Sequence, residues 1–236
     1  MTLSVLFDKE VKDDSFSGGW GLSYLMGEDL LFDTGEKFDY LAHNAEKMHL
    51  DLASFKKIVI THDHWDHTGG LWGLLKLNPQ RIVYACSGFS REFKDRVKSA
   101  GAVLIEVKEK EEIVPGIYST GEIKTEYKGE PLSEQALVLD KGDHCLLFSG
   151  CAHPGIVMMA EKVKNDFAKP VTAVLGGFHL LDKEKRYVEY VITQLRDMGV
   201  TRVAAVHCTG FDAQVLFKQA WKKDFISLKT GMTLEV

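Results

Sequence analysis

Short apolar runs alternate with amphipathic stretches along most of the chain. Residues 57–61 and 171–175 contain hardly any polar side chains, which is typical of strands that are buried on both faces. Residues 38–50 and 183–198 place apolar side chains at helical spacing, which predicts helices with one buried face. The complete pattern predicts strands at residues 3–7, 21–26, 30–33, 57–61, 81–86, 103–107, 135–140, 144–149, 171–175 and 203–206, and helices at residues 38–50, 70–77, 90–100, 154–165, 183–198 and 213–222.

Strands interleaved with helices predict an α/β protein built from layers of sheet and helix. The chain has no internal repeat and no linker tract, so a single domain over residues 1–236 is expected. Side chains that can perform chemistry follow directly after predicted strands, at Asp33, at residues 62–67, at Cys151, at His179 and at His207. Loops at strand ends are where α/β proteins assemble their sites, so these residues are expected to share one site.

The composition narrows the classes of function. Of the 236 residues, 45% are hydrophobic and 27% are charged, which is ordinary for a globular protein with a core. The formal net charge of -5, with no basic run, argues against a nucleic-acid partner. No signal peptide and no apolar stretch of about 18 residues is present, so no membrane association is expected. The cysteines form no CxxC pair, and free thiols in a cytoplasmic protein are expected.

The segment that follows the predicted strand at residues 57–61 is rich in metal-binding side chains. His62, His64, Asp66 and His67 offer imidazole nitrogens and a carboxylate on one loop, and such a loop can divide its donors between two ions. The alternative is a solvated histidine-rich turn. The order of strand, ligands and two glycines favours a metal loop. Zinc is the expected metal, although manganese and iron accept the same ligands.

This segment also resembles a known family. THDHWDHTGGL at residues 61–71 resembles the HxHxDH motif of the metallo-β-lactamase superfamily, and LLFDTG at residues 30–35 resembles its upstream strand-turn motif. Three later segments, SGCAHPG, GGFHL and HCTG, resemble one branch, labelled 7,8-dihydropterin-6-methyl-4-(β-D-ribofuranosyl)aminobenzene-5′-phosphate synthase-like. The resemblance implies a four-layer αββα sandwich, with two sheets face to face and helices outside.

The resemblance also implies a ligand for each position of a two-metal site. His62 and His64 would bind one ion, and Asp66 and His67 would bind the second. His207, at the end of a predicted strand, would complete the second site.

The third ligand of the first ion cannot be assigned from the family motif alone, because the chain departs from that pattern. Residues 132–137 lack the histidine that many relatives have there, and Cys151 occupies the position of a bridging aspartate. We assign His153 as the third ligand, with the thiolate of Cys151 in reserve. Pro154 is expected in the first turn of the helix that follows. The alternatives are a His153 that only hydrogen-bonds the backbone and a Cys151 that is a small buried residue.

Four further residues have roles that the sequence leaves open. Asp33 is expected to accept the outer N–H of a ligating histidine, or else to end its strand in a turn. His179, after two glycines, is expected to contact substrate or transfer a proton, with a structural turn histidine as the alternative. Trp65 and Trp72 flank the metal loop and are expected to pack in the core, with a place in the wall of a pocket as the alternative for Trp65.

These expectations define an enzyme. The leading hypothesis is a hydrolase in which a metal-activated hydroxide attacks a phosphoester, a phosphodiester or a lactone-like ester, with Asp66 or His179 handling a proton. The alternatives are a non-hydrolytic synthase acting on a pterin-type or phosphoribosyl substrate, a di-iron redox protein, and a binding module without activity. The expected partner is a small molecule, which can be anionic. No GxSxG elbow, P-loop or GxGxxG occurs, which disfavours acyl-serine and nucleotide-cofactor chemistry.

Overall fold

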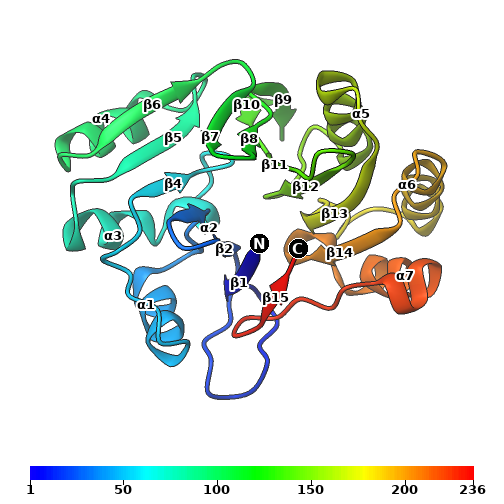
Figure 1. Ribbon diagram of the computed structural model, residues 1–236, viewed down its shortest axis with the longest axis horizontal. Helices are drawn as coiled ribbons and strands as arrows, with labels where there is room; N and C mark the ends of the chain where they lie inside the picture. Colours follow the sequence, from blue (N-terminus) through cyan, green and yellow to red (C-terminus); the bar gives the residue numbers. More distant parts are fainter. The chain divides into compact units, whose positions relative to one another are not determined.

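The computed structural model describes residues 1–236, which form two compact units. Unit 1 consists of Met1–Lys108 together with Leu228–Val236, and unit 2 consists of Glu109–Ser227. Each unit has one large mixed sheet with helices packed along it (Figure 1). The predicted α/β class is therefore confirmed. None of the helices is long and apolar enough to cross a membrane.

The sheet of unit 1 has seven strands in the order β15-β1-β2-β3-β4-β5-β6. β1, β2, β3 and β15 pair antiparallel, whereas β3 to β6 run parallel with helical crossovers between them. The strands are β1 (Thr2–Phe7), β2 (Ser23–Met26), β3 (Leu30–Phe32), β4 (Lys57–Val59), β5 (Ile82–Cys86), β6 (Val103–Val107) and β15 (Thr233–Glu235). The helices are α1 (Phe38–Lys47), the short α2 (Trp65–Thr68), α3 (Leu71–Leu77) and α4 (Arg91–Ser99).

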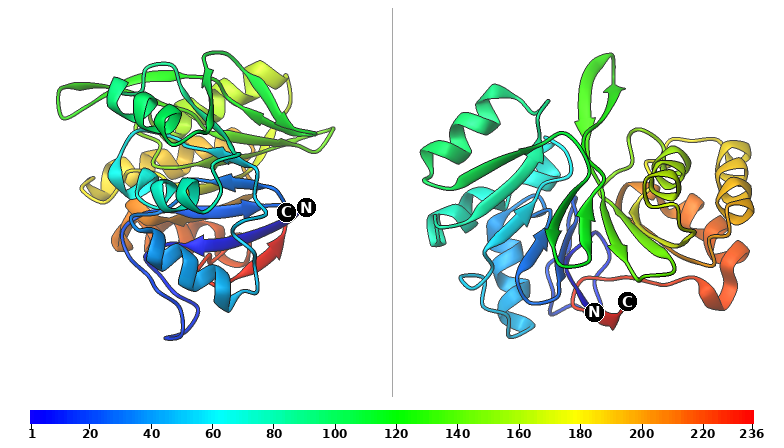
Figure 2. Two further views of the ribbon diagram at one scale, coloured as in Figure 1. Left: turned by 90° about the vertical axis from the view of Figure 1, so that its left-hand side faces the viewer. Right: turned by 45° about the horizontal axis from the view of Figure 1, so that its top comes forward.

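The sheet of unit 2 has six strands in the order β14-β13-β12-β11-β8-β7. Its parallel half, β12 to β14, is crossed over by α5 and α6, and β9 and β10 form a separate hairpin that projects as an arm (Figure 2). The strands are β7 (Glu111–Val114), β8 (Ile117–Ser119), β9 (Ile123–Tyr127), β10 (Glu130–Glu134), β11 (Leu137–Asp140), β12 (Cys145–Ser149), β13 (Val171–Gly177) and β14 (Arg202–Val206). The helical segments are α5 (Ile156–Phe167), α6 (Lys185–Asp197), η1 (His207–Thr209), α7 (Phe211–Trp221) and η2 (Lys222–Asp224).

Two predicted details are wrong. The helix after β12 begins at Ile156 rather than at Pro154, because Gly155 has a φ of 99° and sets the chain into the helix only afterwards. Trp65 is 60% exposed instead of packed in the core. It lies on a single helical turn whose buried side chains are Asp66, His67 and Thr68, and this leaves the outer face to the indole.

Arg81 anchors the polar backbone of unit 1. It is the largest fully buried side chain of the chain. Its guanidinium donates hydrogen bonds to the backbone carbonyls of Leu52 and Phe55, in the connection between α1 and β4, and of Leu74 in α3. Because buried carbonyls must find donors, this one side chain stabilises the packing of the loops before β4 and β5.

We expect Arg81→Met to lower the free energy of unfolding by about 3 kcal/mol or more, because it leaves buried carbonyls without donors. Arg91→Met is the matched control, since the Arg91 side chain is 94% exposed and pairs only with Asp95. That control should change stability by less than about 0.5 kcal/mol. Urea denaturation of the two variants compares them directly, and equal midpoints would contradict the anchoring role of Arg81.

Candidate metal centre

The carboxylate of Asp33 is the centre of a buried hydrogen-bond network in unit 1. Its Oδ1 accepts the backbone N–H of Thr61 at 2.7 Å. Its Oδ2 accepts the hydroxyl of Thr61 at 2.8 Å and Nδ1–H of His67 at 2.6 Å. These residues meet because β3 and β4 are adjacent parallel strands, so the residues that follow them lie at the same sheet edge. Asp33 has a φ of 54°, a left-handed conformation that aspartate tolerates better than most residues.

This network assigns the tautomers of two histidines. The Thr61 hydroxyl donates its one hydrogen to Asp33, so at its 2.9 Å contact with Nδ1 of His62 it must accept. Nδ1 of His67 donates directly to the carboxylate. Both imidazoles therefore carry their proton on Nδ1, which leaves the Nε2 lone pair for a metal ion.

The spacing of the donor atoms in unit 1 fits a divalent ion. Nε2 of His67 lies 3.5 Å from Oδ2 of Asp66. Two ligands at about 2.1 Å from a tetrahedral ion are about 3.4 Å apart. The ring of His62 has its centroid 4.1 Å from that of His67 and 4.6 Å from that of His64. A loop of three imidazoles and one carboxylate at these distances is suited to hold such an ion.

The turn after β3 holds the histidine loop in place. The backbone N–H and the hydroxyl of Thr34 both donate to the carbonyl of His67, at 2.9 and 2.7 Å. Gly69 lets the end of the histidine loop lie close to Glu36 in the same turn, because a Cβ at this position would be 2.0 Å from the carbonyl oxygen of Glu36. The glycine that follows the ligands is thus a packing requirement of the loop.

Unit 2 gathers its candidate residues in the same way. The parallel strands β12, β13 and β14 are neighbours, so the residues after each strand lie at one edge of the sheet. Three of these residues have left-handed backbones, a strained conformation that clusters at functional sites, namely Ala152, His179 and His207 with φ values of 57°, 50° and 51°. The residues brought to this edge are Cys151, His153, His179, His207 and Cys208.

Glu134 holds the loop after β12, and sequence reasoning missed it. Its side chain is fully buried at the end of β10. Oε1 accepts the backbone N–H groups of Cys151 and Ala152, at 3.0 and 2.8 Å, and Oε2 accepts that of His153 at 2.7 Å. Three backbone donors on one carboxylate fix the conformation from which the His153 side chain projects. The sequence signal was only an acidic residue in front of an apolar strand.

The rings of His153 and His179 lie beside each other, with their planes tilted by 49°. Their ring centroids are 4.3 Å apart, and the ring of Tyr127 from the projecting hairpin lies 4.7 Å from His153 and 5.4 Å from His179. Nδ1 of His179 is buried and has no hydrogen-bond partner within the chain. An unpartnered buried imidazole nitrogen is costly, so this atom is available for an external ligand.

The two thiols of this edge form a group with His179. The ligand atoms of Cys151, His179 and Cys208 lie within 4.8 Å of one another. Burial opposes ionisation of Cys208, but its hydrogen bond with Cys151 and the charge of His207 hold the pKa of the thiol well below its usual range. Gly177 makes room for this sulfur, because a Cβ there would lie 2.6 Å from it. Cys151 therefore lies close to one thiol and one imidazole, and the ring of His153 lies beside those of Tyr127 and His179.

Comparison with known proteins identifies the family. A family model of the metallo-beta-lactamase superfamily matches residues 21–162. The chain belongs to this superfamily, and the predicted metallo-β-lactamase fold is confirmed.

Three proteins illustrate the relationship. The 7,8-dihydropterin-6-methyl-4-(beta-D-ribofuranosyl)-aminobenzene-5'-phosphate synthase of Methanocaldococcus jannaschii is 28% identical over 91% of this chain and 89% of that protein. The crystal structure of Tm1679, described as a metal-dependent hydrolase of the beta-lactamase superfamily, is 27% identical with a TM-score of 0.83, over 100% of this chain and 99% of that one. The short form of human tRNase Z is 14% identical with a TM-score of 0.63, over 100% and 99%, and shares the fold.

We expect Asp33→Asn to weaken metal binding by about 10–100-fold, because an amide cannot hold both histidines in their Nδ1–H tautomers. Asp63→Asn is the control in the same loop, since Asp63 accepts only the backbone N–H of Ser90. A competition titration with a chromogenic chelator measures both affinities. The tautomer assignment would lose its support if the two variants bound metal equally well.

We expect Glu134→Gln to weaken metal binding by about 10-fold, because the amide nitrogen cannot accept a backbone N–H and the loop of His153 loosens. Unfolding free energy should fall by about 1–3 kcal/mol for the same reason. Glu130→Gln, an exposed change on the same strand, should alter neither quantity. Wild-type metal affinity in Glu134→Gln would show that the loop keeps its conformation without this carboxylate.

Proposed function

We propose that this protein is a metal-dependent hydrolase that acts on a phosphoester, a phosphodiester or a lactone-like ester. The observation that supports this most directly is the Asp33 network, which turns Nε2 of His62 and of His67 into lone-pair donors. A loop with a purely structural role does not need two histidines in one enforced tautomer. Membership of the metallo-beta-lactamase superfamily and the likeness to a metal-dependent hydrolase at 27% identity add support.

The proposed cofactors are two divalent ions, zinc in the first instance, with manganese or iron as alternatives that accept the same donors. Cys151 is the reserve for His153, because its thiolate is also a good zinc ligand. The proposed ligands are His62, His64, Asp66, His67, His153 and His207.

Bound ions of this kind lower the pKa of a water molecule toward about 7 and polarise a phosphoryl or acyl oxygen. The chain supplies the orientation and the proton transfers. His179 is the first candidate for moving a proton, because its buried Nδ1 has no partner within the chain. Asp66 is the second candidate, since its side chain is buried and its Oδ2 lies 3.5 Å from Nε2 of His67, close to the proposed ion. The proposed substrate is a small molecule.

A second candidate function is that of a synthase acting on a pterin-type or phosphoribosyl substrate. The observation in its favour is the 28% identity to the archaeal synthase over 91% of this chain. The two candidates differ in their product. A hydrolase releases an alcohol or acid from a single substrate, whereas a synthase joins two substrates and leaves simple esters intact.

We expect the purified protein to hold about two divalent ions per chain and to hydrolyse at least one member of a panel of chromogenic phosphoesters, phosphodiesters and lactones. His67→Ala should lose metal and slow turnover by more than about 100-fold, because removal of a direct ligand exceeds the effect of losing outer support. His43→Ala is the control, as His43 bonds only the carbonyl of Ser15. Elemental analysis and initial rates give both quantities.

Two outcomes would overturn the proposal. Hydrolysis by a protein stripped of metal would show that no metal takes part. A metal-loaded protein that leaves the whole panel intact, but joins a pterin compound to a ribosylated aminobenzene phosphate, would favour the synthase.

A further inference from the structure

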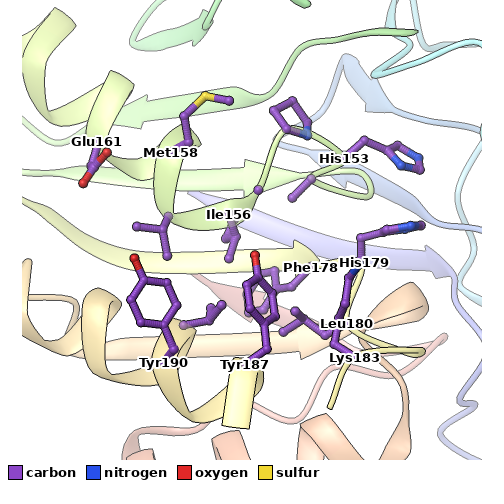
Figure 3. Close-up of a pocket in the computed structure, with 15 residues that line it drawn as sticks. His153, Ile156, Met158, Glu161, Phe178, His179, Leu180, Lys183, Tyr187 and Tyr190 are labelled. Atoms are coloured by element: carbon purple, nitrogen blue, oxygen red, sulfur yellow. The ribbon is translucent and has the colours of Figure 1, made fainter. Parts of the chain in front are cut away.

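Unit 2 contains a pocket of about 360 Å³ that opens beside the histidines of the candidate site (Figure 3). Its walls come from the start of α5, the loop after β13 and the exposed side of α6. His153 and His179 line one end of it. A volume in this range suits the organic part of a small molecule.

The wall formed by α6 is aromatic. Tyr187 and Tyr190 are 46% and 54% exposed, whereas the other exposed side chains of α6 are charged or polar. They are three residues apart on the helix and so lie side by side, with ring centroids 6.1 Å apart and planes tilted by 35°. Met158, which is 41% exposed, faces the pocket from α5. Apolar surface left open in this way gains stability when a flat ring covers it.

The two ends of the pocket carry side chains of opposite charge. Lys183 lies at the end near His179, and Glu161 lies at the opposite end (Figure 3). Neither forms an ion pair within the chain. A lysine beside the histidines attracts an anionic group to that end, and the carboxylate repels one from the far end. The pocket thus favours a molecule with its anion at the histidines and an uncharged body against the tyrosines.

We propose that this pocket binds a flat aromatic group of the substrate, with an anionic group such as a phosphate directed toward His153, His179 and Lys183. Tyr187 and Tyr190 determine the specificity by packing on the ring. The orientation toward the histidines rests on the proposed function, whereas the preference for an aromatic ring rests on the pocket alone.

Binding of non-hydrolysable phosphonates to the metal-loaded protein tests this without turnover. Isothermal titration should show phenylphosphonate binding about 3- to 10-fold more tightly than cyclohexylphosphonate, which has the same charge and a similar size but no flat face. The double variant Tyr187→Leu/Tyr190→Leu should lose this preference, while its affinity for methylphosphonate changes less than about twofold. Phe211→Leu is the matched control, because Phe211 is 68% exposed but lies outside the pocket.

Equal binding of the two ring phosphonates, a preference that survives in the double variant, or no binding of phenylphosphonate overturns the proposal. The result is separable from the proposed function. If the protein prefers phenylphosphonate but hydrolyses no substrate, the proposed hydrolase function is wrong and the proposal for the pocket stands. If the protein hydrolyses a substrate but does not prefer phenylphosphonate, the hydrolase function stands and the proposal for the pocket is wrong.

Discussion

The candidate metal site depends first on one buried carboxylate. Asp33 is removed from water, and a buried charge is tolerated only when it is fully hydrogen-bonded. Thr61 and His67 donate hydrogen bonds to it, and the Thr61 hydroxyl in turn accepts the Nδ1–H of His62. The need to satisfy this carboxylate therefore dictates which nitrogen of each imidazole carries the proton. The parallel pairing of β3 and β4 places the carboxylate within reach.

Unit 2 uses a buried carboxylate for a different purpose. Glu134 accepts three backbone N–H groups and so shapes the loop of Cys151 and His153, rather than polarising a side chain. Both carboxylates accept hydrogen bonds from a segment that follows a parallel strand and carries candidate metal ligands. The common principle is that the strands supply position and the buried acids supply orientation. The superfamily fold provides the strand ends, and the identity of the donors decides the chemistry.

Most strands could be predicted from the sequence, because buried parallel strands such as β4 and β13 are continuous apolar runs. Each of these two runs is followed by residues that can bind metal or transfer protons. It was insufficient for β7 to β10, whose short strands have mixed burial and no clear period. Glu134 lies there, and it is 17 residues from the nearest group that it binds, so no local motif could reveal it. β15 was missed because its pairing with β1 is set by tertiary structure rather than by its own pattern.

The most direct test of the central claim is nitrogen NMR of the histidine rings in the metal-free protein labelled with ¹⁵N-histidine. The account predicts that His62 and His67 are neutral Nδ1–H tautomers with a lone pair on Nε2, and that both assignments are lost in Asp33→Asn while that of His144 is unchanged. Nε2–H tautomers at His62 and His67 in the unaltered protein would contradict it, because the carboxylate would then not select the nitrogen that meets the metal.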